Sequence, residues 1–173
     1  LLQLKMSALH DNIADNPWIE SVSVKRVFPE ELVVTVQEKQ AYFWVQHGDR
    51  LYYADQKGRR ITRISPDRFV SLPVLYMQGE GLKSELSMLV NHLEDMSFPF
   101  SFQDIAWINI KPAGSIEMRI QSLGMDILMD EQVLRQGPER LNRIWKDLKK
   151  RNETKQVERI ILLGNNAWVG FKG

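Results

Sequence analysis

The stretch from Asn16 to Glu38, NPWIESVSVKRVFPEELVVTVQE, decides the fold of the N-terminal part of this chain. Apolar residues alternate with polar ones on both sides of Pro29, and this period of two predicts a pair of half-buried strands. The alternating positions are Val22, Val24, Arg26 and Phe28 before the proline and Leu32, Val34 and Val36 after it. Pro29-Glu30-Glu31 is the expected turn, so the stretch predicts a β-hairpin.

A helix is expected immediately before this hairpin. Leu2, Met6, Leu9 and Ile13 recur at the spacing of one helical face. Asn16-Pro17 ends the helix, because the residue before a proline is pushed out of the α region. The predicted order is therefore helix, strand, turn, strand.

This order resembles the closing half of a POTRA domain, in the version carried by the FtsQ/DivIB cell-division proteins. The resemblance is carried by Pro17-Trp18-Ile19, the alternating run to Arg26, Phe28-Pro29, and the β-branched run that ends at Glu38. It implies that a strand and a helix precede the first helix, with a short cytoplasmic tail and a single transmembrane anchor before them. The chain begins at Leu1 without these parts, so we expect it to be a fragment whose anchor is not included.

The composition excludes several classes of function. The chain of 173 residues is 43% hydrophobic, which suits one ordinary domain or two small ones. Its net charge of +1 gives no overall field that would attract nucleic acid or anionic lipid. The absence of cysteine excludes disulfides, thiolate zinc sites and cysteine nucleophiles. No uninterrupted apolar window of about 18 residues is present, so no segment of the sequence is predicted to span a bilayer.

The remainder of the chain predicts a larger mixed sheet. Strands are expected over residues 41–45, 50–54, 60–64, 105–110, 115–120, 125–129, 159–163 and 167–171. Amphipathic helices are expected over residues 82–96 and after Gly137-Pro138, where Leu141, Ile144, Trp145 and Leu148 form one stripe.

We therefore predict an α+β fold in two parts. A truncated POTRA-like β-hairpin/helix unit occupies residues 1–41, and a larger mixed-sheet β-domain of the FtsQ type, with two amphipathic helices, occupies residues 42–173. The junction has no Gly/Ser linker, so the two parts should be held rigidly. The segment from Leu51 to Ile61, LYYADQKGRRI, resembles a short element of the family in which an aspartate precedes a glycine by three residues.

Catalytic and metal-binding patterns are weak, and we expect no enzyme activity, no cofactor and no metal site. His10, His47 and His92 are far apart in the sequence and lack the helical spacing of metal ligands. Glu30-Glu31 and Asp130-Glu131 are interpreted as turn residues, since neighbours in an extended chain point to opposite faces. Gly79 and Gly81 form a GxG without the third glycine of a phosphate-binding loop.

A group of basic residues lies on and after the last predicted helix: Lys146, Lys149, Lys150, Arg151, Lys155 and Arg159. A nucleic-acid or anionic-lipid surface is one interpretation. The simpler one is a solvated helix face, because acidic residues are interspersed and no aromatic residues accompany the cations. We therefore expect no nucleic-acid partner.

The C-terminal strand carries the main functional hypothesis. Residues 167–171, AWVGF, are apolar on both faces and end the chain, so this strand lies at a sheet edge unless an earlier strand pairs outside it. An open edge binds a strand of a partner by β-augmentation. Trp168 and Phe171 would then act as anchors, whereas in the alternative both aromatic residues belong to the core.

The resemblance implies which partner binds there. In the family, the last strands receive a strand from the FtsB-type protein, which arrives with the FtsL-type protein as a coiled coil. The matching residues predict a binding site at Leu163, Asn165, Asn166, Ala167, Trp168, Val169, Gly170 and Phe171. Leu163 occupies the position of a partner-contacting tyrosine, and Ile161-Leu162 replace an Asp-Leu-Arg portion, so salt bridges to the partner from that portion are not expected.

By this resemblance, the protein is a non-enzymatic divisome scaffold on the periplasmic side of the inner membrane at the division septum. It would bind other divisome proteins through the POTRA-like part, and help to recruit and regulate septal peptidoglycan synthesis. Two alternatives remain: a POTRA-bearing module of an outer-membrane assembly or secretion protein, and a cell-wall-associated enzyme. The first predicts further POTRA copies and barrel strands, and the second predicts a pocket with a perturbed acid or base.

Overall fold

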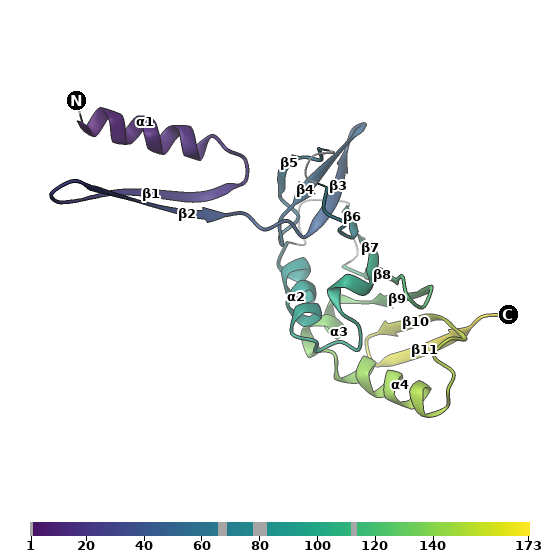
Figure 1. Cartoon of the computed structure of the whole chain (residues 1–173). Helices are drawn as coiled ribbons and strands as arrows, with labels where there is room; N and C mark the ends of the chain where they lie inside the picture. Colours follow the sequence, from purple (N-terminus) through teal and green to yellow (C-terminus); the bar gives the residue numbers. More distant parts are fainter. Residues whose placement is uncertain (1, 66–68, 78–82, 112–113) are drawn as a thin grey trace.

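The computed structural model describes residues 2–65, 69–77, 83–111 and 114–173 and has the predicted α+β fold (Figure 1). Helix α1 spans Leu2–Ala14, and strands β1 (Ile19–Val27) and β2 (Glu31–Glu38) form an antiparallel hairpin. The peptide bond between Phe28 and Pro29 at the turn is cis. Helix α1 packs along β1. The predicted order of helix, strand, turn and strand is confirmed.

The hairpin is more exposed than the alternation of its residues predicts. Val22 and Val24 of β1 are partly buried, but every residue of β2 is exposed, with Val34 at 39% and Val36 at 41%. The physical reason is coverage: α1 contacts β1, and no described element covers the same face of β2. The prediction that both strands are half-buried is wrong for β2.

The second part is a nine-stranded mixed sheet with the strand order β11-β10-β9-β8-β7-β6-β3-β4-β5. Its strands are β3 (Phe43–His47), β4 (Arg50–Ala54), β5 (Arg60–Arg63), β6 (Val74–Met77), β7 (Ile105–Ile110), β8 (Ile116–Ile120), β9 (Met125–Met129), β10 (Val157–Leu163) and β11 (Asn166–Phe171). Three neighbouring pairs are parallel: β3 with β6, β6 with β7, and β9 with β10. The remaining neighbouring pairs are antiparallel.

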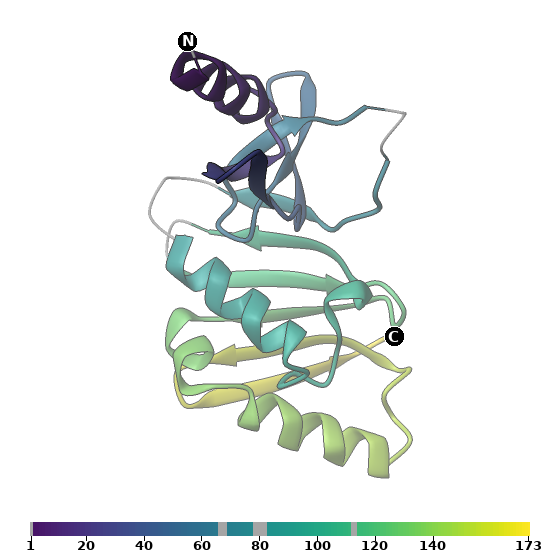
Figure 2. The same ribbon diagram turned by 60° about the vertical axis from the view of Figure 1, so that its left-hand side comes forward.

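The helices of this part lie on one face of the sheet (Figure 2). They are α2 (Lys83–Glu94), the short α3 (Glu131–Gln136) and α4 (Glu139–Lys150), with a 3₁₀ turn, η2, at Phe102–Asp104. Alternate residues of the central strands face these helices and are buried, among them Ile108, Met118 and Ile127 at 0–1% exposure. On α4, Leu141 and Trp145 complete the core, and Trp145 meets Phe100 with a ring separation of 4.7 Å. The core therefore lies between one sheet face and the helices.

The opposite face of the sheet carries half-buried polar residues. Asp126 of β9 lies between two arginines, with Arg119 Nη1 at 2.9 Å and Arg159 Nη2 at 3.6 Å. We call this surface the open face, because no helix that the structure describes covers it (Figure 2).

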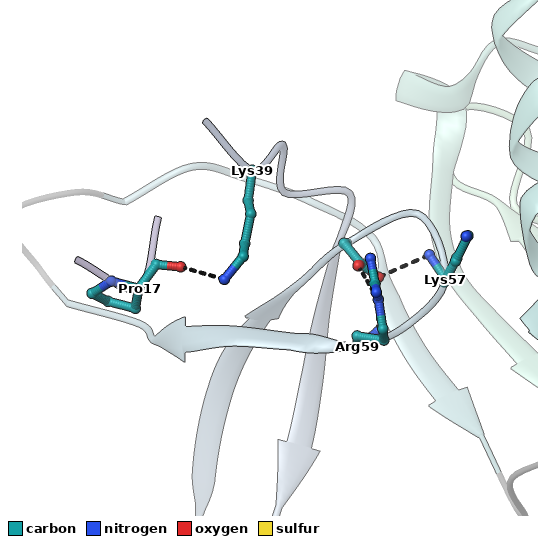
Figure 3. Close-up of polar contacts among 5 residues, drawn as sticks. Pro17, Lys39, Lys57 and Arg59 are labelled. Atoms are coloured by element: carbon teal, nitrogen blue, oxygen red, sulfur yellow. Dashed lines mark hydrogen bonds and ion pairs between the residues drawn. The ribbon is translucent and has the colours of Figure 1, made fainter. Parts of the chain in front are cut away.

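Hydrogen bonds of Lys39 close the base of the hairpin unit, and a ring contact joins this unit to the nine-stranded sheet. The Lys39 backbone N–H donates to Trp18 O at 2.7 Å, and Lys39 Nζ donates to Pro17 O at 3.0 Å (Figure 3). The Trp18 ring lies 5.3 Å from the ring of Tyr53 in β4. The hairpin sheet ends at Glu38 and the second sheet begins at Phe43. The division into residues 1–41 and 42–173 stays a prediction.

The turn between β4 and β5 needs both its aspartate, Asp55, and its glycine, Gly58. The carboxylate of Asp55 accepts the backbone N–H groups of Lys57 and Arg59, each at 2.9 Å, and the Arg59 side chain closes the loop at 2.6 Å (Figure 3). Gly58 has a φ of +74°, and a Cβ there would meet the side chains of Leu75 and Leu86 at 3.2–3.3 Å. A Cβ at this position would press on core side chains, which would have to shift by a few tenths of an ångström.

Three elements of the structure are absent from the sequence prediction: β6, α3 and the 3₁₀ turn η2. Asp130 is the N-cap of α3 and Glu131 is its first residue, so the interpretation of this pair as turn residues is wrong. The helix predicted over residues 82–96 is described from Lys83 to Glu94. Residue 82 and the Gly79–Gly81 pattern lie outside the described residues.

Candidate partner-binding edge

Strand β11 lies at the end of the nine-stranded sheet and pairs with β10 on one side. Within the described parts of the chain, no strand pairs with its other side. Figure 1 shows β11 at the margin of the sheet farthest from the hairpin unit. The aromatic side chains of this strand are accessible, with Trp168 at 50% and Phe171 at 45% exposure. The alternative in which both rings are core residues is therefore wrong.

The register defines which backbone groups face outward. Leu163 and Asn166 flank a two-residue loop and are paired, so the N–H of Asn166 faces β10. At the other end, the N–H of Lys172 donates to Gln156 O at 2.7 Å. Because orientation alternates along an antiparallel strand, even-numbered residues face β10. The N–H and C=O groups of residues 167, 169 and 171 therefore face the open side.

The side chains of β11 alternate between the two faces of the sheet. Val169 pairs with Ile160, which is fully buried, and packs against the core on the helix side. Trp168 pairs with the half-buried Ile161 on the open face. A strand bound at this edge would therefore find apolar side chains on both faces of the sheet.

The turn between β10 and β11 is held by side chains from two other elements. Asp130 Oδ2 accepts the N–H of Gly164 at 2.5 Å, while Asp130 Oδ1 accepts the N–H of Val133 at 2.8 Å. Arg140 of α4 donates from Nη1 to the carbonyl of Gly164. Gly164 has a φ of +51°, which suits the first position of a tight hairpin turn. Sequence reasoning missed Asp130 and Arg140, although an aspartate before a helix is a recognisable N-cap signal.

The opposite edge of the sheet, β5, differs from β11 in ways that discourage strand pairing. It has four residues with an arginine at each end, and its pairing with β4 is irregular between Tyr53 and Ala54. The guanidinium of Arg60 lies over the Tyr52 ring at 5.6 Å. Short, charged and irregular edges are how proteins avoid unwanted strand addition. β11 has six residues and no charged side chain, so it lacks these protections.

The predicted site residues lie together on the hairpin formed by β10 and β11. Asn165 and Asn166 lie at the turn and are exposed, and Leu163 is 37% exposed at the end of β10. Residues 166–171 form the edge strand itself. All eight predicted residues thus lie on one hairpin, but whether they bind a partner stays a prediction.

Other candidate chemistry is scattered over the molecule. His10 contacts Asp11 at 3.1 Å on α1, His47 lies 6.5 Å from the Tyr52 ring, and His92 lies against Phe98. Among the residues that the structure describes, no group of three histidine, aspartate or glutamate side chains is placed to hold a metal ion. No described helix is long and apolar enough to cross a membrane.

A cleft of about 880 Å³ lies between the N-terminal ends of the parallel strands and the linker from the hairpin unit, with Trp44, Trp107 and Arg119 in its wall. Tyr42 also lines this cleft, where burial and the nearby Glu94 carboxylate raise the pKa of its hydroxyl. A raised pKa keeps the phenol protonated, which is the opposite of what a base or nucleophile needs. The cleft therefore supplies hydrogen-bonding and aromatic surface, and the phenol of Tyr42 is held protonated there.

The basic residues near the C-terminal end of α4 are partly paired within the chain. Arg151 forms an ion pair with Asp147 and lies 3.7 Å from Glu153. Ion pairing lowers the pKa of Asp147 and raises that of Arg151. Lys146 and Lys149 of α4 are exposed to solvent. This arrangement is typical of a solvated helix face.

Comparison with known proteins agrees with this architecture. A sequence model described as POTRA domain, FtsQ-type, matches residues 1–39. The chain is 24% identical over 139 residues to the cell division protein FtsQ of Rhizobium radiobacter, covering 80% of this chain and 60% of that protein. It is 25% identical over 162 residues to FtsQ of Syntrophotalea carbinolica, covering 87% and 57%. DivIB of Clostridium tetani is 21% identical over 144 residues, covering 77% and 54%.

These findings define the chain first as a POTRA-bearing protein, with a helix and hairpin of POTRA type followed by a mixed α+β sheet. More particularly, the FtsQ-type match at residues 1–39 and the similarity to FtsQ and DivIB over 77 to 87% of this chain support an FtsQ/DivIB family cell-division protein. It spans 54 to 60% of the length of the three relatives named above.

Proposed function

We propose that this chain is the binding portion of a non-enzymatic divisome scaffold. The outer side of β11 receives a strand of an FtsB-type protein, which arrives together with an FtsL-type protein. The scaffold acts on the periplasmic side of the inner membrane at the division septum, where it helps to recruit and regulate septal peptidoglycan synthesis. The POTRA-type unit contributes contacts to other division proteins.

One observation carries this proposal. The outward N–H and C=O groups of residues 167, 169 and 171 lack a partner strand among the described parts of the chain, while the opposite sheet edge is short and arginine-rich. Main-chain hydrogen bonds of this kind give strand addition its affinity, and side-chain contacts beside them give its selectivity. The exposed rings of Trp168 and Phe171 supply those contacts.

Substitution of one outward donor tests the proposal. Val169→Pro removes the outward N–H and leaves the groups that pair with β10 on residues 168 and 170 in place. We expect this variant to lose capture of the FtsB-type and FtsL-type extracytoplasmic segments from the same genome. Val169→Ala is the matched control, because it shortens the same side chain and keeps the donor. Unchanged capture by the proline variant, with a folded circular dichroism spectrum, would contradict strand addition at β11.

A further inference from the structure

Gly170 is a glycine that the fold of this chain does not require. Its φ lies outside the left-handed region, unlike that of Gly58 or Gly164. A Cβ added there would meet only Arg159, with its carbonyl oxygen at 3.9 Å and its Cβ at 4.0 Å, which is ordinary van der Waals contact. Glycine inside a strand weakens it and often marks a close approach of another chain. Its presence on an unpaired edge therefore calls for an explanation outside the fold.

The register places Gly170 on the open face of the sheet. It pairs with Arg159 of β10 and lies two residues from Trp168 on the same face. Its own N–H and C=O face β10, so a residue of an added antiparallel strand opposite Gly170 belongs to a pair without hydrogen bonds. Such pairs have the smaller Cα separation, about 4.5 Å, and their side chains lie closest together.

The side chains around Gly170 determine what it fits. The guanidinium of Arg159 is paired with Asp126 at 3.6 Å. Lys172 Nζ donates to the carbonyls of Leu123 and Lys155, each at 3.1 Å. Because both cations already have partners, an acidic side chain gains little there.

The indole of Trp168 is half exposed next to the empty position, and it offers a planar apolar surface. An aromatic ring that lies over a strand glycine covers the exposed backbone. From that position the ring also reaches a neighbouring aromatic ring on the diagonal.

We propose that Gly170 forms a notch in the edge strand that receives an aromatic side chain of the partner's strand. The notch is bounded by Trp168 and by the stem of Arg159. This inference rests on the proposed function, since it assumes that a strand binds at β11. It makes Gly170 a determinant of register and selectivity: the partner's strand docks where its aromatic residue opposes this glycine.

A substitution that fills the notch tests this inference. Gly170→Val adds a strand-favouring side chain, so the melting temperature should stay the same or rise. Capture of the FtsB-type and FtsL-type segments should fall about tenfold, because the notch is occupied. Asn109→Val of β7 is the matched control, since it adds the same side chain on the open face of the same sheet but away from the edge strand, and it should keep capture. Retained binding by the Gly170 variant, or equal loss in both variants, would overturn the notch.

A crosslinking experiment covers the case in which Gly170→Val destabilises the hairpin. The chain has no cysteine, so Gly170→Cys introduces a single thiol. Single cysteines are placed along the strand of the FtsB-type partner, and disulfide formation is measured at each position. The strongest crosslink is expected where the natural partner residue is aromatic, and a strongest crosslink at a small or charged position would contradict the proposal.

The two sets of variants distinguish failure of the notch from failure of the proposed function. If Val169→Pro also leaves capture intact, the proposed function itself fails. If only the Gly170 tests fail, strand addition at β11 stands without the notch.

Discussion

Removal of the Asp130 carboxylate should loosen the turn that carries the edge strand. The carboxylate accepts two backbone N–H groups, from Val133 at 2.8 Å and from Gly164 at 2.5 Å. Loss of an N-cap costs about 1 kcal/mol. Loss of the second hydrogen bond, from the Gly164 N–H to the carboxylate, costs about 1.5 kcal/mol. This value is the lower end of the range for hydrogen bonds to charged groups, because Gly164 is partly accessible to water. Asp130→Ala should therefore lower the free energy of unfolding by about 2.5 kcal/mol.

Urea denaturation followed by tryptophan fluorescence measures this loss, and amide exchange of Gly164 reports the turn directly. In a domain of this size, the same change lowers the melting temperature by about 5–10 °C. Asp130→Asn is the control, because asparagine is an equally good N-cap and keeps one acceptor. We expect it to lose less than half as much stability as the alanine variant. A loss below about 0.5 kcal/mol for Asp130→Ala, or equal losses for both variants, would refute the reasoning.

Two further predictions concern the rest of the fold. Gly58→Ala should lower the free energy of unfolding by about 2–3 kcal/mol in urea denaturation, because overpacking adds to the strain of a positive φ. Gly48→Ala is the control, since Gly48 has a φ of +59° and no atom lies within 4 Å of the added Cβ. This variant should show the backbone cost alone, about 1 kcal/mol. Equal losses in the two glycine variants would contradict the packing argument. The pKa of Glu85 lies below its ordinary value of 4.5, first because the Ser84 hydroxyl donates to it and then because of Arg135 at 2.7 Å. Its ionised form therefore stabilises the fold above about pH 4.5, and this contribution is lost as the pH falls through the lower folded-state pKa. Glu85→Gln should flatten the decline of stability in acid. Identical slopes for variant and parent, in denaturation followed from about pH 6 to below the ordinary pKa of 4.5, would refute the assignment.

The sequence predicted those elements whose periodicity is long enough to recognise. The hairpin, the strands from β7 to β11 and the stripe of α4 all show it, and they were found within a few residues of their observed bounds. β6 was missed because it has only four residues and follows a proline, and its partners β3 and β7 are distant in sequence. The six residues of α3 are too few to show a helical stripe, so Asp130 was interpreted as part of a turn.

The candidate site was predictable as a segment but not as a geometry. The apolar pattern of residues 167–171 predicts a strand, yet its place in the sheet depends on the parallel pairing of β9 with β10 across α3 and α4. No local pattern reveals that crossover. The contacts that hold Gly164 join residues separated by 24 and 34 positions, so they follow from tertiary packing alone. The space beside Gly170 is bounded by Arg159 of the neighbouring strand, so no local sequence pattern reveals it.

The most direct test of the open edge is amide hydrogen exchange along β11, with and without the bound partner. In the free chain, the N–H groups of Ala167, Val169 and Phe171 should exchange rapidly, while that of Trp168 is protected by β10. Binding of the FtsB-type and FtsL-type segments should protect the first three and leave Trp168 unchanged. Protection of all four groups in the free chain, or no gain at residues 167, 169 and 171 in the complex, would contradict strand addition at this edge.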